Sequence, residues 1–243
     1  MKVEDIVKSV RLCIDEEADN GSSLADAGLN DESKMDSIIK DKIGDALRWV
    51  CLFAPADMLG GSDEVETGTT TEVPTGVLVD VTSDDTGFDI DQIDDYDAGV
   101  ITLDSNFIKL ARVRVEGWHR AVRVPISEDS DEYLQLYDSN GATATADRPQ
   151  AALIEKSQRQ LEVWPWEDTK SVCLTYVANC EPKAITTGSG TSLEITAYAL
   201  PPRARTAIIY YLAFLLCSAY GDARAARMLE IARMSLGTAD RIA

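Results

Sequence analysis

Few side chains in this sequence have the types and spacing that catalysis requires. The chain has a single histidine, His119, so it cannot build a site with several histidine ligands. It contains no G-x-S-x-G, H-E-x-x-H or Walker A pattern, and the GSG at 188–190 is not followed by the Lys and Ser or Thr of a phosphate-binding loop. His119 follows Trp118 at an expected turn, which favours a surface position. We therefore predict that the protein is not an enzyme and has no catalytic residue, metal ion or cofactor.

The densest group of potential metal ligands is the acidic run DIDQIDDYDAG at 89–99. Carboxylate oxygens suit calcium, and an EF-hand loop uses acidic residues at alternate positions. Ile93, however, stands where such a loop needs its third ligand, and no glycine follows in the required step. We expect a solvated loop here. A negatively charged channel lining or partner surface is the other interpretation.

Two tryptophans, Trp164 and Trp166, flank Pro165 at the end of a predicted strand. Their rings could stack on a sugar, which would make the β-rich region a receptor- or glycan-binding component of a virion. Large aromatic side chains at strand ends more often pack on the core or at an interface. We therefore favour packing and keep glycan binding as the alternative function.

Charge is distributed unevenly along the chain. The formal net charge is −19, and residues 1–106 carry all of this excess because acids and bases balance in 107–243. The segment 49–108 contains no Lys or Arg, whereas the stretch FIKLARVRVEGWHRAVRVP at 107–125 is rich in both. A chain with this much negative charge repels DNA phosphates. We therefore do not expect sequence-specific binding to nucleic acid.

Helical periodicity marks both ends of the chain. Residues 3–15 and 32–55 place apolar side chains three or four positions apart, and Pro55 ends the second segment. Near the other end, 203–220 is apolar on nearly all sides, and 222–236 follows after Gly221. A helix that is apolar all round needs partners on every side, so we expect the helices of both ends to form one bundle. Its predicted shared core is Ile38, Ile39, Leu47, Ile208, Leu212 and Leu216.

The pattern between these helices predicts β-structure. GVLVDV at 76–81 and GVITL at 99–103 are short strand candidates, AALIEK and LEVWPW predict a hairpin, and SVCLTYV at 171–177 continues the sheet. LARVRV and WHRAVRV alternate apolar and basic side chains around Glu116-Gly117, which predicts a second hairpin. Alternation places Arg112 and Arg114 on one face of their strand and the intervening valines on the other.

The remaining composition favours a soluble, intracellular protein. No apolar N-terminal segment is typical of a secretion signal, and the longest uncharged apolar run, 206–220, is shorter than a bilayer-spanning helix. The cysteines are odd in number and show no C-x-x-C pattern, so we expect buried thiols rather than disulfides or a zinc site. They are Cys13, Cys51, Cys173, Cys180 and Cys217.

Together these patterns predict an α+β fold, in which N-terminal helices (1–57) and C-terminal helices (201–243) form a helical bundle and 58–200 is an inserted antiparallel β-domain. The order of elements begins with two helices and a β-region that contains IKLARVRVEGWHRAV. The stretches EDSDEYLQLYDS and ALIEKSQRQLEVWPWEDTKSVCLTYV follow, and then a closing pair of helices. This order resembles the head-to-tail adaptor (ring or tail-tubular) proteins of short-tailed bacteriophages and is similar to the ring proteins of crAss-like phages. The resemblance spans nearly the whole chain.

The resemblance implies a structural virion protein. In that family a helical bundle and a β-domain form one subunit of a ring, typically a homododecamer, that docks beneath the portal protein. The ring meets other tail or ring proteins and extends the channel through which DNA passes during ejection, without sequence-specific binding. The implied location is the neck or tail of the virion after synthesis in the host cytoplasm, with no membrane involved.

On this interpretation, the basic hairpin contacts an acidic patch on a neighbouring subunit or ring. The alternative is a solvated face whose arginines pair with local acids such as Glu128, Asp129, Asp131 and Glu132. The segment 227–243 has more apolar residues than one helix face needs, so part of it is expected to contact a neighbouring subunit or the portal. The predicted interface residues are Arg112, Arg114, Arg120, Arg123, Met228, Leu229, Ile231, Met234 and Leu236.

Overall fold

The computed structural model describes residues 2–15, 32–59, 77–85, 88–93, 96–138, 144–154, 159–179, 183–187, 190–194 and 200–237. The described residues combine helices with antiparallel and mixed sheets, which confirms the predicted α+β class. The chain divides into two compact units. We call Met1–Val77 with Asn179–Ala243 the helical unit and Leu78–Ala178 the β unit.

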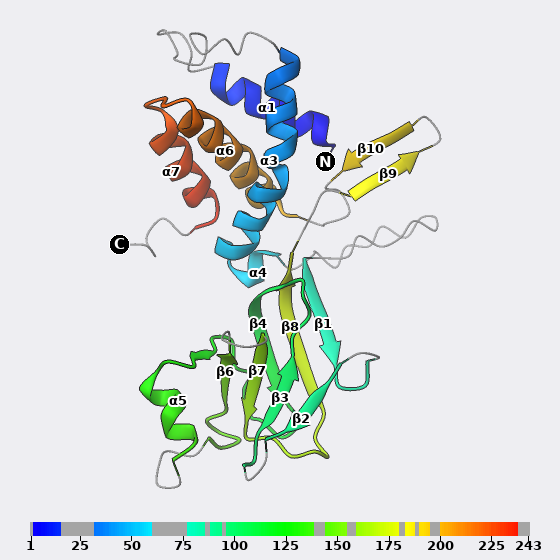
Figure 1. Cartoon of the computed structure of the whole chain (residues 1–243), viewed down its shortest axis with the longest axis vertical. Helices are drawn as coiled ribbons and strands as arrows, with labels where there is room; N and C mark the ends of the chain where they lie inside the picture. The colour runs from blue at the N-terminus through cyan, green and yellow to red at the C-terminus, as the bar shows by residue number, and fades with distance from the viewer. Residues whose placement is uncertain are drawn as a thin grey trace. The chain divides into compact units, whose positions relative to one another are not determined.

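The helical unit contains helices from both ends of the chain (Figure 1). These helices are α1 (Val3–Asp15), α3 (Glu32–Phe53), α4 (Ala56–Leu59), α6 (Pro202–Ala219) and α7 (Ala225–Ser235). The apolar positions at helical spacing are the buried ones, for example Ile6 and Val10 in α1 and Ile43 and Leu47 in α3. Two strands, β9 (Lys183–Thr187) and β10 (Gly190–Glu194), also belong to this unit and pair only with each other among the described strands.

Helix α6 contacts α1, α3 and α7. This agrees with its composition, because an apolar helix is covered on several sides by partners that each contribute one apolar face. Ile208, Leu212 and Leu216 of α6 are buried, as are Ile39 and Leu47 of α3, whereas Ile38 is only half-buried. At the contact between α3 and α6, the rings of Trp49 and Tyr211 stack with their centroids 4.2 Å apart.

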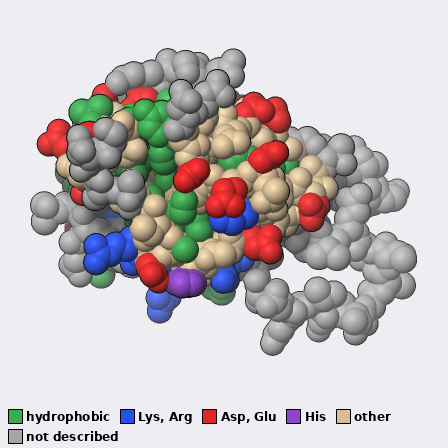
Figure 2. Space-filling model, turned by 90° about the horizontal axis from the view of Figure 1, so that it is seen from below, with side chains coloured by type: hydrophobic (Ala, Val, Ile, Leu, Met, Phe, Trp, Pro, Cys, Tyr) green, Lys and Arg blue, Asp and Glu red, His purple; other side chains and the backbone are tan. Residues whose placement is uncertain are grey.

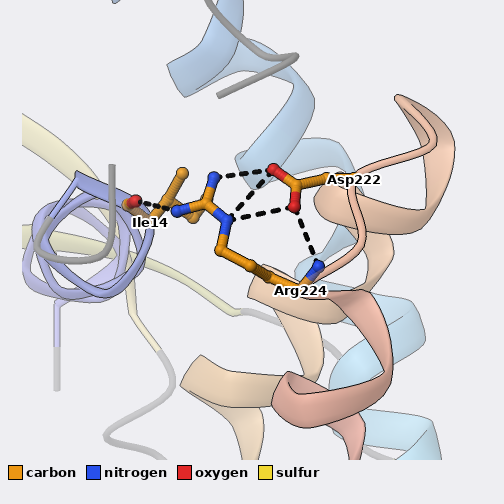
Figure 3. A network of polar contacts seen from close by, with 3 residues as sticks. All are labelled: Ile14, Asp222 and Arg224. Carbon is orange, nitrogen blue, oxygen red and sulfur yellow. Dashed lines mark hydrogen bonds and ion pairs between the residues drawn. The ribbon is translucent and has the colours of Figure 1, made fainter. Parts of the chain in front are cut away.

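A hydrogen bond from Arg224 ties the connection between α6 and α7 to α1 (Figure 3). Gly221 takes the left-handed backbone conformation that ends α6 (φ +68°). The Arg224 guanidinium donates to the Asp222 carboxylate at 2.6–3.1 Å and to the Ile14 carbonyl oxygen at 2.7 Å. Ile14 lies in the last turn of α1, whose carbonyl groups have no partner within their own helix. The Arg224 side chain therefore joins helices from opposite ends of the chain.

In the described residues, the β unit consists of two sheets and one short helix. The first sheet has the order β1-β8-β4, and the second has the order β2-β3-β7-β6-β5. All pairings are antiparallel except that of β5 with β6. The strands are β1 (Leu78–Thr82), β2 (Ile90–Gln92), β3 (Gly99–Thr102), β4 (Phe107–Val115), β5 (Ile126–Ser127), β6 (Gln150–Ile154), β7 (Gln160–Trp164) and β8 (Val172–Ala178), and the helix is α5 (Asp131–Leu136).

The core of the β unit draws on both sheets. Val113 and Leu174 come from the first sheet, and Ile101 and Val163 come from the second. The ring of Trp166 packs so closely against Gly99 that a methyl group there would lie 2.8 Å from two of its ring atoms. Since real side-chain carbons do not approach that closely, only glycine fits at the start of β3.

The predicted hairpin of β6 and β7 is confirmed, since the two strands pair from Gln150 with Trp164 to Ile154 with Gln160. The other predicted hairpin is wrong in its second arm. Residues 118–125 are not a strand: within this stretch only Val122 pairs with β4, by two hydrogen bonds to Val113. Trp118 explains the difference, because its ring is buried and its indole N–H donates to the Pro165 carbonyl oxygen at 2.8 Å. An inward side chain at this point breaks the alternation, and β4 pairs with β8 instead.

Candidate functional site

The predicted basic face of β4 is present. Arg112 and Arg114 are exposed, whereas Val113 and Val115 between and after them are buried, as alternation requires. Strand β8 has β4 on one side and β1 on the other. The basic face thus lies on an edge strand of the first sheet.

Arg112 has a carboxylate partner within its own chain. Its Nε donates to the hydroxyl oxygen of Thr175 at 3.0 Å, and its guanidinium lies 3.8 Å from the Asp80 carboxylate. The Thr175 hydroxyl in turn donates to Asp80. Strand register explains this group, because Thr175 of β8 stands opposite Asp80 on one side and Arg112 on the other. Arg112 thus helps to hold the sheet together. Its partner Asp80 lies in the segment 49–108, which contains no Lys or Arg, and not among the acids of 128–132.

Beyond β4, the chain forms what we call the basic loop, residues 119–125. The Arg114 guanidinium donates to the Trp118 carbonyl oxygen at 3.4 Å, and the backbone N–H of His119 donates to the Ala146 carbonyl oxygen at 3.0 Å. The His119 Nδ1 lies 2.5 Å from a carboxylate oxygen of Asp147. Both side chains are exposed, so His119 occupies the predicted surface position. The histidine, purple in Figure 2, lies among blue basic and red acidic side chains.

The basic loop exposes an apolar side chain between charged ones. Val124 has 81% of its surface exposed, the largest fraction among the exposed large apolar residues of the described part of the chain. Arg120 and Arg123 are exposed beside it. The loop is held to the β unit through Trp118 and Val122, so Val124 protrudes from an anchored support. The sequence signal for this feature was the same alternation that predicted a strand.

The β unit also has a pocket of about 440 Å³, which we call the acidic pocket. Buried Ile101, Leu174 and Tyr176 contribute apolar surface to it, and these side chains come from both sheets. Its exposed lining residues include Asp85, Asp89 and Asp104. Burial raises the pKa of the Tyr176 hydroxyl, and the charge of Asp104 raises it further. The pocket therefore combines an apolar floor with a negative rim. Sequence reasoning missed it because its residues come from separate strands.

Trp164 and Trp166 are both buried, as the packing interpretation predicted. Trp166 donates its indole N–H to the Lys170 carbonyl oxygen at 3.0 Å, and Trp164 packs edge-on against Tyr96 and Tyr137. Neither ring offers an open face on which a sugar could stack. This removes the residues on which the glycan-binding alternative depended.

A buried carboxylate lies beside this aromatic group. Glu162 of β7 accepts hydrogen bonds from the hydroxyl groups of Tyr133 and Tyr137, at 3.1 and 2.8 Å. Burial raises the pKa of both hydroxyl groups above the ordinary tyrosine value, which favours the protonated, hydrogen-bond-donating form. Each donor has an acceptor, and the arrangement holds α5 against β7. Because the hydrogen bonds of this carboxylate are made within the protein, we assign it a structural role. The sequence did not indicate this group.

The C-terminal part of the predicted interface requires a correction. Met228 and Leu236 are buried within the helical unit, so their side chains are not available to a neighbouring subunit. Leu229 and Ile231 are half-buried. Met234 is 61% exposed and remains the apolar residue of α7 best placed for a contact outside the chain. The wide apolar face of this segment is explained by burial against other parts of its own unit.

Other predicted features fall partly within the described residues. Among the cysteines in the described residues, Cys51 and Cys217 are buried and Cys13 and Cys173 are partly buried; Cys180 lies outside the described residues. The acidic run is described except for Asp94 and Asp95, and the described part of the chain contains no group of three or more possible ligands arranged to hold a metal. No helix in the described ranges is long and apolar enough to cross a membrane.

Comparison with known proteins adds no assignment. A scan of the sequence against protein families finds no match, and a search of curated proteins finds none either.

Proposed function

We propose that this protein is a structural subunit that assembles with copies of itself into a ring, as the head-to-tail adaptors of short-tailed phages do beneath the portal. One observation carries the proposal: the β unit exposes basic and acidic surfaces on separate elements. The basic loop presents Arg120 and Arg123, and the acidic pocket presents Asp85, Asp89 and Asp104. A chain with a net charge of −19 repels its own copies unless opposite charges meet at the contact.

The same charge suits a channel through which DNA moves. Strong DNA binding needs many Lys and Arg contacts to phosphates, and the net charge of this chain opposes them. A negatively charged ring would let DNA pass without holding it. The proposed partners are further copies of the chain, the portal protein and adjacent tail or ring proteins, in the neck or tail of the virion.

The proposal is tested by adding purified protein to portal-bearing phage heads that lack it and sedimenting the heads. The protein should sediment with these heads but not with heads stripped of their portal. Isolated protein should not shift duplex DNA in a gel at physiological salt. Equal recovery with both kinds of head, or tight DNA binding, would contradict the assignment.

A further inference from the structure

Two features of the β unit complement each other in shape and charge. The basic loop exposes Val124 between arginines, and the acidic pocket places an apolar floor within a rim of aspartates. Such a pocket is complementary to an exposed apolar side chain that is flanked by cations. The long stem of an arginine can cover apolar surface while its guanidinium reaches a carboxylate.

We propose that the basic loop of one copy docks in the acidic pocket of the next copy. Val124 enters the pocket above Ile101 and Leu174, and Arg120 and Arg123 face the aspartates of the rim. The occupant is a second copy of this chain because the chain itself carries the complementary surface. This inference rests on the proposed ring function and names the contact that would build the ring.

The positions of the two features make this contact head-to-tail. The pocket includes Val81 of β1, and the basic loop pairs with β4 through Val122. Strands β1 and β4 lie on opposite sides of β8 in the same sheet (Figure 1). A contact between two different surfaces leaves one of each unused in a pair of copies, so further copies can add. The product is a ring where the rotation between copies closes and an open filament where it does not. A two-fold dimer would instead use both loops and both pockets of its two copies and leave none for further growth.

Two variants each alter one of the two surfaces of the proposed contact. Val124→Asp places a carboxylate at the tip of the loop and leaves the pocket intact. Thr102→Arg places a long cation at an exposed position of β3 that lines the pocket, and leaves the loop intact. Both positions are exposed, so the fold should tolerate the changes, which circular dichroism and thermal unfolding would check. Leu134→Asp is the matched control, because Leu134 is also an exposed apolar residue of the β unit.

The experiment is sedimentation velocity on full-length protein. Each variant alone should remain monomeric under conditions in which the wild type and Leu134→Asp assemble, with the dissociation constant raised about tenfold or more. An equimolar mixture of Val124→Asp and Thr102→Arg should form dimers and nothing larger. In such a dimer, the intact pocket of the Val124→Asp copy holds the intact loop of the Thr102→Arg copy. The remaining loop and the remaining pocket are both altered, so no further copy can add.

The outcomes distinguish this contact from the ring itself. If wild-type protein assembles and both variants assemble equally well, the loop and pocket are not the contact, while the ring function stands. If both variants are monomeric and their mixture is too, the two surfaces do not bind each other and the inference is overturned. Equal loss of assembly in Leu134→Asp would also overturn it. If wild-type protein never assembles at any concentration, the proposed function fails together with the inference.

Discussion

At the scale of single residues, close packing and buried charge make the strongest demands on the sequence. Gly99 must be glycine because of the ring of Trp166, and Asp222 must be charged because of Arg224. Each constraint leads to a measurable effect of one substitution. Neither requires that the protein assemble.

Gly99→Ala should lower the free energy of unfolding by about 1–3 kcal/mol, because the added methyl group would overlap the Trp166 ring and force it to move. Gly44→Ala is the matched control in α3, where an added methyl group meets no atom within 4 Å. There the change should stabilise the protein by up to about 1 kcal/mol, since alanine favours helix. Urea denaturation would measure both variants. Equal effects of the two substitutions would contradict the packing described for Trp166.

Asp222→Asn should lower the free energy of unfolding by about 2 kcal/mol at pH 7, because it weakens charge-assisted hydrogen bonds in a largely buried site. The hydrogen bonds and charge of Arg224 hold the pKa of Asp222 below its ordinary value in the folded protein. A carboxyl group with a lowered folded pKa stabilises the protein above its unfolded pKa, and this contribution is lost as the pH falls through the folded value.

The stability difference between wild type and Asp222→Asn should therefore shrink as the pH falls below about 4. Urea denaturation at pH 7 and pH 3 would show this, and the difference between proteins removes the effect of other carboxylates. Arg203→Ala, on an exposed position of α6, should change the stability by less than about 0.5 kcal/mol at either pH. A difference that stays constant down to pH 3 would show that the Asp222 charge does not stabilise the fold.

At the scale of elements, local periodicity predicted which side chains face inward more reliably than which strands pair. Alternation in β4 gave the correct buried face, because burial depends on neighbouring residues of one strand. Its partner β8 lies far along the chain, and no local pattern specifies that register. Because Trp118 is buried, the residues after it do not form the second strand of the predicted hairpin. The residues Met228 and Leu236 were assigned to an interface for a related reason, since an apolar pattern cannot say whether its partner is the same chain.

The burial of α7 also changes what a truncation would show. Removing all residues after Tyr220 would take away buried Met228, Ala232 and Leu236. Loss of assembly in that truncation would follow from damage to the helical unit alone. Substitution of exposed Met234 by serine is the better probe of a contact made by α7.

Leu212→Ala tests how closely α6 is packed. Leu212 is buried in the middle of the helix that contacts α1, α3 and α7, so the substitution removes apolar contacts and leaves a cavity. The free energy of unfolding should fall by about 2–5 kcal/mol in a urea titration. Phe214→Ala is a useful comparison because Phe214 is only partly buried, and it should cost less. Equal or smaller loss in Leu212→Ala would show that the centre of α6 is not tightly covered.

At the scale of the whole molecule, the proposed assembly depends on charge. Reversal of Arg112 would place a carboxylate beside Asp80 of the same chain, so it would disturb the β unit itself. The double change Arg120→Glu and Arg123→Glu is the cleaner test, because both residues lie in an exposed loop. It should leave thermal unfolding nearly unchanged and block assembly of full-length protein.

Assembly of the wild type should also weaken with added salt, since ions screen exposed charges beyond about 8 Å at physiological ionic strength. Sedimentation velocity at low and high salt would follow both effects. Assembly that is insensitive to salt and to the double charge reversal would leave the basic loop as a solvated surface without a role in association.

Negative-stain electron microscopy of concentrated full-length protein can show whether copies of this chain close into a ring, as we propose. We predict closed rings of uniform diameter with a central channel, which disappear in the Arg120→Glu, Arg123→Glu variant. Their number of subunits can be counted from averaged end views. Monomers at every concentration, or compact two-fold dimers without a channel, would contradict the account.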